Sequence, residues 1–401
     1  MRIGIDATAI RPGHSAGVEA FTYGLVNGLA AGPHELAVRT LAGTGDEWHR
    51  RVTGGRISWS EVSLALRTDN GVGRFLRRHT PNRLHSSVVV RRTLNLIRQR
   101  GRHGTGVDCD VTVYPFHAAP VDSDPAVVVL HDLRQFQPDF GSAGYRDVIR
   151  RNVERAAAIV VSWPHPYQQT LETFPAARDK TVLIPPPTFH SAPKHPQVEP
   201  EPGLLVYPSS TAPHKNHETL VEAMALLPEC RLVCPGPLVE PVASRLRARV
   251  RGSDLRGRVH FPGFVAVPEL DRLYSRAAAV VVPSLWEAAS GAVFEAFSWG
   301  LPVVCADVPP LRAQLEFARA EAGLFAPRDP AALAVAVRQV LADRDRYADA
   351  ARAASNRLAG RTWTDTARDY TAILEWVRDG GTGPLPRSPF VAGLTDLEGA
   401  V

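Results

Sequence analysis

The chain has 401 residues, of which 44% are hydrophobic and 22% are charged. This composition is typical of a packed globular protein and excludes disorder, collagen and coiled coil as descriptions of the whole chain. The formal net charge is +5, but residues 70–107 carry nine arginines and no acidic residue, so the remainder sums to −4. The protein is therefore not uniformly basic, and its length predicts two to three domains at about 150 residues each.

Four cysteines form no C-x-x-C pair and complete no zinc pattern: Cys109, Cys230, Cys234 and Cys305. They predict reduced core thiols in a cytosolic protein. The N-terminus turns polar at Asp6, too early for the apolar stretch of a signal peptide, and no run approaches the ~18 apolar residues of a membrane span. We expect a cytoplasmic protein that is soluble or at most peripherally attached to a membrane.

The first half of the chain alternates strands with helices. It opens with a short apolar strand around Ile3, a glycine-bearing loop over 11–17, and a helix whose apolar residues recur at helical spacing from Phe21. Short β-branched strands follow at Val111–Tyr114, Ala126–Leu130 and Ala158–Ser162. This alternation predicts a parallel sheet with helices on both faces.

Residues 185–203 contain seven prolines, a density that blocks both helix and central strand and predicts an interdomain linker. The alternation then restarts. Strands are expected at Leu204–Tyr207, Arg231–Cys234, Val259–Phe261, Ala278–Val282 and Pro302–Cys305. Helices are expected at Glu218–Leu227, Pro241–Val250, Pro268–Arg276, Val293–Trp299, Ala331–Leu341 and Trp363–Val377.

The fold class is therefore α/β, with two Rossmann-like, doubly wound domains facing a cleft. We place the N-terminal domain at 1–190, the proline-rich linker at 191–203, the C-terminal domain at 204–379 and a loose tail at 380–401. In such sheets ligands bind beyond the carboxyl ends of the strands.

The segment PSLWEAASGAVFEAFSWGLPVV follows one of these strands and contains two glutamates eight positions apart. Glu287 lies in the loop beyond the strand, and Glu295 lies in the first turns of a helix that Gly291 opens and Gly300 closes. Ionised carboxylates suit ligand hydroxyls, because each accepts two short hydrogen bonds from a diol. The alternative is that Glu295 is an ordinary helix-surface residue and Glu287 an ordinary loop charge. The apolar segment around the pair makes this alternative weaker than it would be for a random pair of glutamates.

A lysine follows another strand in YPSSTAPHKNHETLVEAM. Lys215 directly precedes Asn216, which would cap the next helix. A lysine beside free backbone N–H groups at the start of a helix suits a diphosphate. The alternative is a solvated lysine near a helix cap. The flanking His214 and His217 are ambiguous, since His217 could serve in capping.

His131 directly follows a strand in VVVLHDL, so it could meet a substrate or be an ordinary loop histidine. The loop from Gly13 to Gly17 opens a helix but is not a G-x-G-x-x-G motif, so alone it is weak support for ligand binding.

Together these residues resemble the retaining family 4 glycosyltransferases, which have the GT-B fold. The glutamate spacing is the specific part. The loop ending at Gly17, His131, the strand ending at Ser162, the HKNH segment and the GFV turn after Phe261 support it. The resemblance implies an acceptor-side N-terminal domain, a nucleotide-sugar-binding C-terminal domain, and a last helix that returns to the first domain.

The resemblance also implies residue roles. The catalytic residues would be His131 at the reacting face, Lys215 against the leaving diphosphate and Glu287 on the donor sugar. Glu295 would hold the ribose hydroxyls, Phe264 and Val265 would lie beside the base, and Gly17 would admit the phosphates. The backbone amides of Ser290, Gly291, Ala292 and Val293 would meet the sugar and distal phosphate, and Ser209 would line the donor site.

The activity that the resemblance implies is transfer of a hexosyl group from a nucleotide sugar to a hydroxyl of a glycan, glycolipid or small molecule. No metal and no cofactor are expected. Two departures leave the donor open. Ser209 and Ser210 occupy the stretch where relatives commonly have an arginine, and Glu287-Ala288-Ala289-Ser290 replaces E-G-F-G.

Three interpretations of the arginine-rich segment 70–107 stay open: a solvated insertion, a contact with anionic membrane lipid, or a site for a phosphate-bearing acceptor. Nucleic acid fits poorly, because Phe75 is its only aromatic residue. For the whole chain, the alternatives are a GT-B sugar-nucleotide epimerase and a non-catalytic nucleotide-sugar-binding protein.

Overall fold

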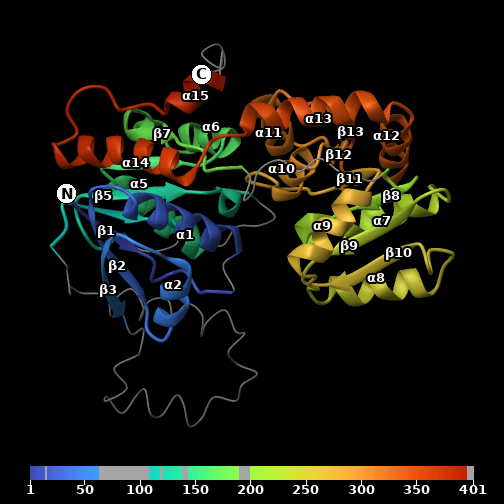
Figure 1. Ribbon diagram of the computed structural model, residues 1–401, viewed down its shortest axis with the longest axis horizontal. Helices are drawn as coiled ribbons and strands as arrows, with labels where there is room; N and C mark the ends of the chain where they lie inside the picture. The colour runs from blue at the N-terminus through green and yellow to red at the C-terminus, as the bar shows by residue number, and fades with distance from the viewer. Residues whose placement is uncertain (14–15, 63–107, 118–120, 138–142, 189–198, 395–401) are drawn as a thin grey trace, which may run out of the picture. The chain divides into compact units, whose positions relative to one another are not determined.

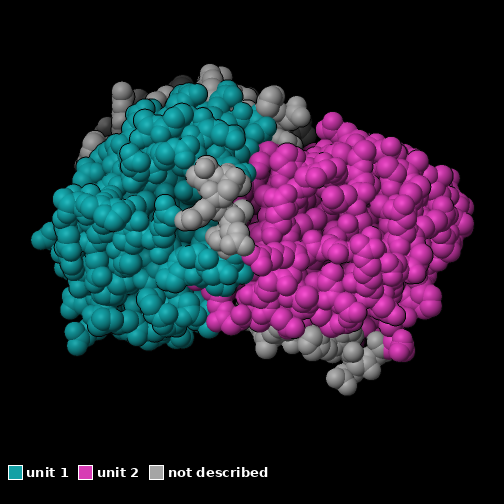
Figure 2. Space-filling model, turned by 90° about the horizontal axis from the view of Figure 1, so that it is seen from above, with its two compact units in different colours: residues 1–162, 166–186, 362–401 teal, residues 163–165, 187–361 magenta. Residues whose placement is uncertain are grey.

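A computed structural model describes residues 1–13, 16–62, 108–117, 121–137, 143–188 and 199–394. The chain divides into two compact units (Figure 2). Unit 1 comprises residues 1–162, 166–186 and 362–401, and unit 2 comprises residues 163–165 and 187–361. The arginine-rich segment 70–107 lies outside the described residues, as does most of the predicted linker.

Unit 1 is built on a seven-stranded parallel sheet in the order β3-β2-β1-β4-β5-β6-β7 (Figure 1). Its strands are β1 Arg2–Asp6, β2 Glu35–Leu41, β3 Arg56–Val62, β4 Val111–Tyr114, β5 Ala126–Leu130, β6 Ala158–Val161 and β7 Thr181–Leu183. The predicted strand around Ile3 is β1, and the three strands predicted with bounds are present within one residue of them. Strands β2, β3 and β7 were not predicted from the sequence.

The central strands of unit 1 are apolar throughout because both of their faces are covered. In β5, Val127 and Val129 belong to one buried cluster, whereas Val128 and Leu130 belong to a second cluster. Successive side chains of a strand point to opposite faces, so a continuous run of valine supplies both layers of the core.

The described helices of this unit are α1 Ala16–Ala30, α2 Gly45–Arg51, α5 Ala143–Arg155, α6 Pro164–Thr173, α14 Trp363–Arg378 and α15 Pro389–Leu394. Helix α14 packs against α1 and buries Tyr370, Ile373 and Leu374 in the same cluster as β1. The last long helix thus returns to the N-terminal unit, as the resemblance implied. The predicted C-terminal boundary at 379 was wrong for this reason, since unit 2 ends at Arg361.

Two glycines of α1 allow this close packing. A Cβ on Gly24 would stand 1.9 Å from the ring of Trp363, and one on Gly28 would stand 2.4 Å from the Trp363 carbonyl oxygen. The described part of the C-terminal tail also packs. Ser388 is buried and its hydroxyl donates to Asp369.

Unit 2 is built on a six-stranded parallel sheet in the order β10-β9-β8-β11-β12-β13. Its strands are β8 Leu204–Val206, β9 Arg231–Pro235, β10 Val259–Gly263, β11 Ala279–Val282, β12 Val303–Ala306 and β13 Gly323–Phe325. Counted from its own first strand, the sheet has the order 3-2-1-4-5-6, which is the Rossmann order. The strand order reverses between β8 and β11, and ligands bind at such a switch point.

The helices of unit 2 are α7 His217–Ala225, α8 Val242–Arg251, α9 Val267–Arg276, α10 Gly291–Ser298, α11 Pro309–Ala318, α12 Pro330–Ala342 and α13 Arg344–Leu358. The chain passes from unit 1 into unit 2 at Pro186 and Pro187, inside the proline-rich segment, and returns at Thr362. The four cysteines are free thiols. Cys230, Cys234 and Cys305 are buried, and Cys109 is half-buried.

Candidate functional site

The two best sequence candidates meet at the switch point of unit 2. Lys215 follows β8 and Glu287 follows β11, and these strands are hydrogen-bonded neighbours. The Lys215 Nζ atom lies 2.6 Å from Glu287 Oε1, and the two side chains are only 19% and 8% exposed. The sequence placed each residue beyond its own strand, and the structure brings them together as a mostly buried ion pair.

Hydrogen bonds join the two loops that carry this pair. The backbone N–H of Leu285 donates to the His214 carbonyl over 2.8 Å, and the Asn216 side-chain amide donates to the Pro283 carbonyl over 3.0 Å. Asn216 is left-handed, with φ 54° and ψ 39°, a conformation that asparagine tolerates better than most residues. It occupies the N-cap position of α7, but its side chain does not cap the helix as predicted. It links the loops instead.

Tyr207, which was not predicted as a site residue, also contacts the two loops that carry Lys215 and Glu287. Its hydroxyl donates to the Lys215 carbonyl over 3.2 Å and lies 2.7 Å from the Ser284 hydroxyl. Burial, and then the charge of Glu287, raise the Tyr207 pKa, so the phenol stays neutral. A buried tyrosine hydroxyl at the end of β8 therefore fixes the backbone on which Lys215 stands.

The second glutamate has a separate buried partner. The hydroxyl of Tyr274 on α9 donates to Glu295 on α10, and the Tyr274 ring stacks on Trp299 with 6.1 Å between ring centroids. Tyr274 is 1% exposed, and burial followed by the charge of Glu295 raises its pKa well above the ordinary value. The structure thus orients both glutamates of the E-x7-E spacing through hydrogen bonds to other residues of unit 2.

Helix α10 begins directly after the loop of Glu287. Ser290 is its N-cap residue, and the Ser290 carbonyl accepts a hydrogen bond from the Phe294 N–H. The N–H groups of Gly291, Ala292 and Val293 have no acceptor within a regular helix and carry the positive end of its dipole. The Ser290 N–H differs, because it donates to the buried side chain of Gln314 over 2.7 Å.

Ser209 lies after β8 in a loop held against the end of β9. Its backbone N–H donates to the Pro235 carbonyl over 2.9 Å. A Cβ on Gly236, whose φ is +144°, would stand 2.3 Å from the Ser209 carbonyl oxygen. Only glycine permits this approach, so Gly236 sets the position of the segment in which relatives commonly have an arginine.

Phe264 and Val265 follow β10 at the same edge of the sheet. The Phe264 side chain is 83% exposed, whereas Val265 is half-buried. An aromatic ring this exposed offers a stacking surface for a flat apolar ring.

His131 and Gly17 belong to unit 1. His131 Nε2 lies 2.8 Å from the Pro115 carbonyl, so that nitrogen donates, and Nδ1 accepts from the Ser162 hydroxyl over 3.2 Å. Burial lowers its pKa to about 4, which keeps the ring neutral. Its ring packs edge-on against Phe21, four residues after Gly17 in α1, with 4.6 Å between ring centroids. Both predicted residues of unit 1 thus lie near the start of α1.

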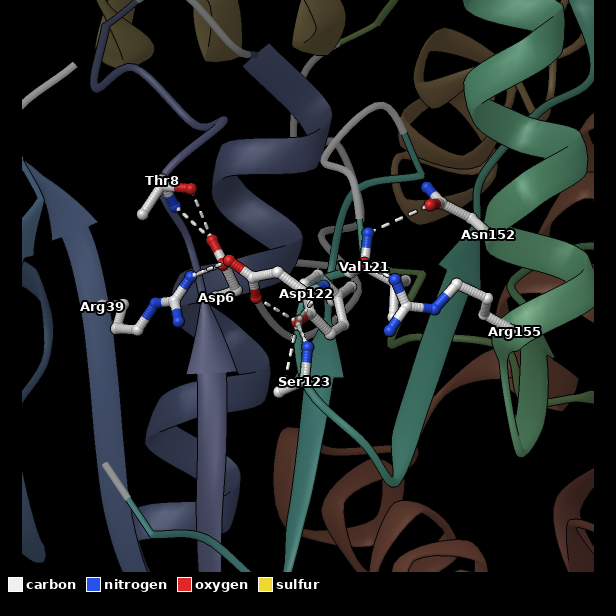
Figure 3. A network of polar contacts seen from close by, with 9 residues as sticks. Asp6, Thr8, Arg39, Val121, Asp122, Ser123, Asn152 and Arg155 are labelled. Atoms are coloured by element: carbon white, nitrogen blue, oxygen red, sulfur yellow. Dashed lines mark hydrogen bonds and ion pairs between the residues drawn. The ribbon is translucent and has the colours of Figure 1, made fainter. Parts of the chain in front are cut away.

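A polar network occupies the switch point of unit 1, between β1 and β4 (Figure 3). Arg39 bridges Asp6 and Asp122 over 2.7 and 2.9 Å. The Tyr114 hydroxyl donates to Asp122, and Thr8 donates its N–H and hydroxyl to Asp6. These contacts link the loops that follow β1 and β4 at the edge of the sheet.

Metal-binding clusters and membrane-spanning helices were sought in the described ranges alone. No group of three or more His, Cys, Asp or Glu side chains there is arranged to hold a metal ion. No helix in the same part of the chain is long and apolar enough to cross a membrane.

Known proteins resemble this chain in sequence and in fold. Residues 191–357 match the family model of the glycosyl transferases group 1. A D-inositol 3-phosphate glycosyltransferase from Jonesia denitrificans is 30% identical over 189 residues, which are 45% of this chain and 44% of that protein. An O-antigen chain mannosyltransferase B from Escherichia coli is 32% identical over 149 residues, or 35% and 37% of the two chains. The matches span less than half the length of either relative.

Solved structures match over nearly the whole chain. Anabaena HepE, solved in complex with UDP and glucose, covers 94% of this chain and 99% of its own with a TM-score of 0.66 at 17% identity. Sucrose-phosphate synthase from Thermosynechococcus elongatus gives the same coverage and TM-score at 18% identity. Residues 191–357 therefore match the glycosyl transferases group 1, and the chain has the GT-B fold, with two Rossmann-like parallel-sheet domains.

Proposed function

We propose that this protein is a retaining glycosyltransferase that moves a hexosyl group from a nucleotide-sugar donor to a hydroxyl of a glycan, glycolipid or small molecule. The observation that carries the proposal is the Lys215–Glu287 pair at the switch point of unit 2. An ammonium group suits the diphosphate of a donor, and a carboxylate suits its sugar hydroxyls. The structurally similar HepE was solved with UDP, which carries a diphosphate, and with glucose, which carries sugar hydroxyls.

The pair acts on the charge that develops during transfer. As the bond between the anomeric carbon and the phosphate oxygen breaks, its electrons stay on the diphosphate. Lys215 and the N–H groups of Gly291 to Val293 would stabilise that charge, which is the largest catalytic effect we expect. Glu287 holds Lys215 in place before the donor arrives and then accepts hydrogen bonds from the sugar.

His131 would contact the substrate without acting as a general base. Its Nε2–H donates to Pro115, and its Nδ1 lone pair is taken by Ser162. The proton of the acceptor hydroxyl would then pass to the departing phosphate oxygen on the same face of the sugar. Because the departing phosphate takes the proton of the acceptor, this route needs no metal ion or cofactor. It retains the configuration at the anomeric carbon.

The remaining donor contacts follow from the same placement. Exposed Phe264 offers its ring face to the nucleobase, and Glu295 offers carboxylate oxygens to the ribose hydroxyls. We also propose that the protein works in the cytoplasm, with a peripheral membrane contact through residues 70–107.

The test replaces the two residues of the pair separately. Lys215→Ala and Glu287→Ala should each lower transfer by at least ~100-fold, because the first removes the charge that stabilises the departing diphosphate and the second removes the carboxylate that orients Lys215 and binds the sugar. A thermal-shift screen against nucleotides and nucleotide sugars first identifies the donor, since a ligand at ~100 times its dissociation constant adds ~2.7 kcal/mol of stability. Turnover is then measured with that donor.

The matched control is Glu218→Ala, which removes an exposed ion pair with Arg245 in the same unit and should leave turnover unchanged. Near-normal turnover in both Lys215→Ala and Glu287→Ala would reject the proposal. Donor incubated alone gives a second check. Conversion to an isomeric nucleotide sugar without acceptor would identify an epimerase, and tight binding without transfer or donor hydrolysis would identify a binding protein.

A further inference from the structure

The buried side chain of Gln314 forms two hydrogen bonds to a single residue. Gln314 lies on α11 and is 3% exposed. Its Oε1 accepts from the Ser290 N–H over 2.7 Å, and its Nε2 donates to the Ser290 carbonyl over 2.9 Å. In the opposite orientation of the amide, Nε2 would face the Ser290 N–H and Oε1 would face the Ser290 carbonyl, so neither hydrogen bond could form. The two partners therefore fix the orientation of the amide. The carboxamide supplies both the donor and the acceptor that Ser290 requires.

The residue held in this way sets where α10 begins. Ser290 ends the loop that starts at Glu287, and its carbonyl also accepts the Phe294 N–H over 3.4 Å. Fixing both polar groups of Ser290 fixes the direction of the next three N–H groups. It also removes the Ser290 N–H from the set that a ligand could use.

We propose that Gln314 is a positioning residue for the phosphate subsite at the start of α10. It holds Ser290 so that the N–H groups of Gly291, Ala292 and Val293 receive the distal phosphate of the donor, and its neutrality keeps a negative charge away from that anion. This inference rests on the proposed function and deepens it. It differs from the expectation that the Ser290 amide itself meets the donor, because that N–H donates to Gln314.

Two substitutions separate positioning from simple packing. Gln314→Glu keeps the shape and can still accept from the Ser290 N–H, but it sets a carboxylate against the Ser290 carbonyl and near the phosphate subsite. Gln314→Met keeps the length, introduces no charge, and removes both hydrogen bonds from residue 314 to Ser290. Gln339→Glu, an exposed position on α12, is the matched control.

The measurement is titration calorimetry with a nucleoside diphosphate and its monophosphate. UDP, GDP and ADP are tried first on the unaltered protein to select the base. Gln314→Glu should weaken diphosphate binding at least tenfold and Gln314→Met severalfold, while monophosphate binding by either variant changes less than twofold. The affinity of Gln314→Glu for the diphosphate should recover as pH falls, because a protonated carboxyl can again donate to the Ser290 carbonyl.

The outcomes are distinct. Equal loss of diphosphate and monophosphate binding, with a lowered unfolding midpoint, would show a structural role only and overturn the inference. Unchanged diphosphate binding by both Gln314 variants would overturn it as well. If the unaltered protein binds none of the three diphosphates, the proposed function fails first, and the experiment shows that failure before any variant is examined.

Discussion

His217 lies beside Lys215, and neither of its buried ring nitrogens has a hydrogen-bond partner among the described residues. Its ring packs between Tyr207 and Phe261, with 4.7 and 6.1 Å between ring centroids. Burial, and then the charge of Lys215, lower the His217 pKa from 6.5 to about 3. The sequence left the role of His217 ambiguous and offered capping as one possibility, but its ring nitrogens do not cap α7 in this structure.

The His217 pKa predicts acid sensitivity. The unfolded chain binds a proton at this site below about pH 6.5, whereas the folded protein does so only near pH 3, so stability is lost as pH falls through that window. Between pH 7.5 and 5, the contribution of this residue should fall by about 2 kcal/mol.

Replacing the ring tests this sign. His217→Phe keeps an aromatic ring between Tyr207 and Phe261 and should lose less unfolding free energy on acidification than the unaltered protein. Urea unfolding at pH 7.5 and 5 measures the difference, and His131 stays in both proteins as a common background. An equal loss in the two proteins would contradict the assigned pKa.

The site could be predicted from sequence only where local pattern sets position. Lys215 and Glu287 each follow an apolar strand, and the carboxyl ends of parallel strands meet at one edge, so their proximity was foreseeable. Gln314 acts through a residue 24 positions away in the sequence. Tyr207 acts through one residue 8 positions away and another 77 positions away. No spacing in the sequence marks such contacts.

At the scale of elements, the strands buried on both faces were the predictable ones. Strands β4, β5 and β11 are short β-branched runs, and their bounds were expected within one residue. Strand β3 alternates between exposed and half-buried residues, and β13 has only three residues, so neither produces a clear apolar run. Their positions depend on pairing with neighbouring strands.

Packing between α1 and α14 gives a prediction at this scale. Gly24→Ala should destabilise unit 1 by ~1–3 kcal/mol or more, because the added methyl group would overlap the Trp363 ring. Differential scanning calorimetry measures the change. Gly144→Ala on α5 is the control, since a Cβ there meets nothing within 4 Å and alanine favours the helix. Equal stability of the two variants would contradict the close packing.

At the scale of the whole molecule, unit 1 is assembled from both ends of the chain, whereas unit 2 is almost continuous. A chain that ends at Arg361 should therefore lose protection in unit 1, because the cluster around Tyr370 and Ile373 disappears from beside β1. Hydrogen exchange of peptides from residues 1–62 and 204–361 measures the two units separately.

A chain that ends at Asp379 keeps α14 and is the control for the shorter chain. It should retain most of the protection in unit 1, and unit 2 should stay protected in both chains. Full protection of residues 1–62 in the chain that ends at Arg361 would show that α14 is dispensable.

The return of α14 to unit 1 also affects the order in which the protein can fold during translation. Unit 2 has all its residues once position 361 has left the ribosome, although it comes second in the sequence. Unit 1 must wait for the last long helix, so its apolar surface around Phe21 and Leu25 stays uncovered while the other unit is completed. The nascent chain is then most exposed to aggregation, and most accessible to chaperones, through its first half.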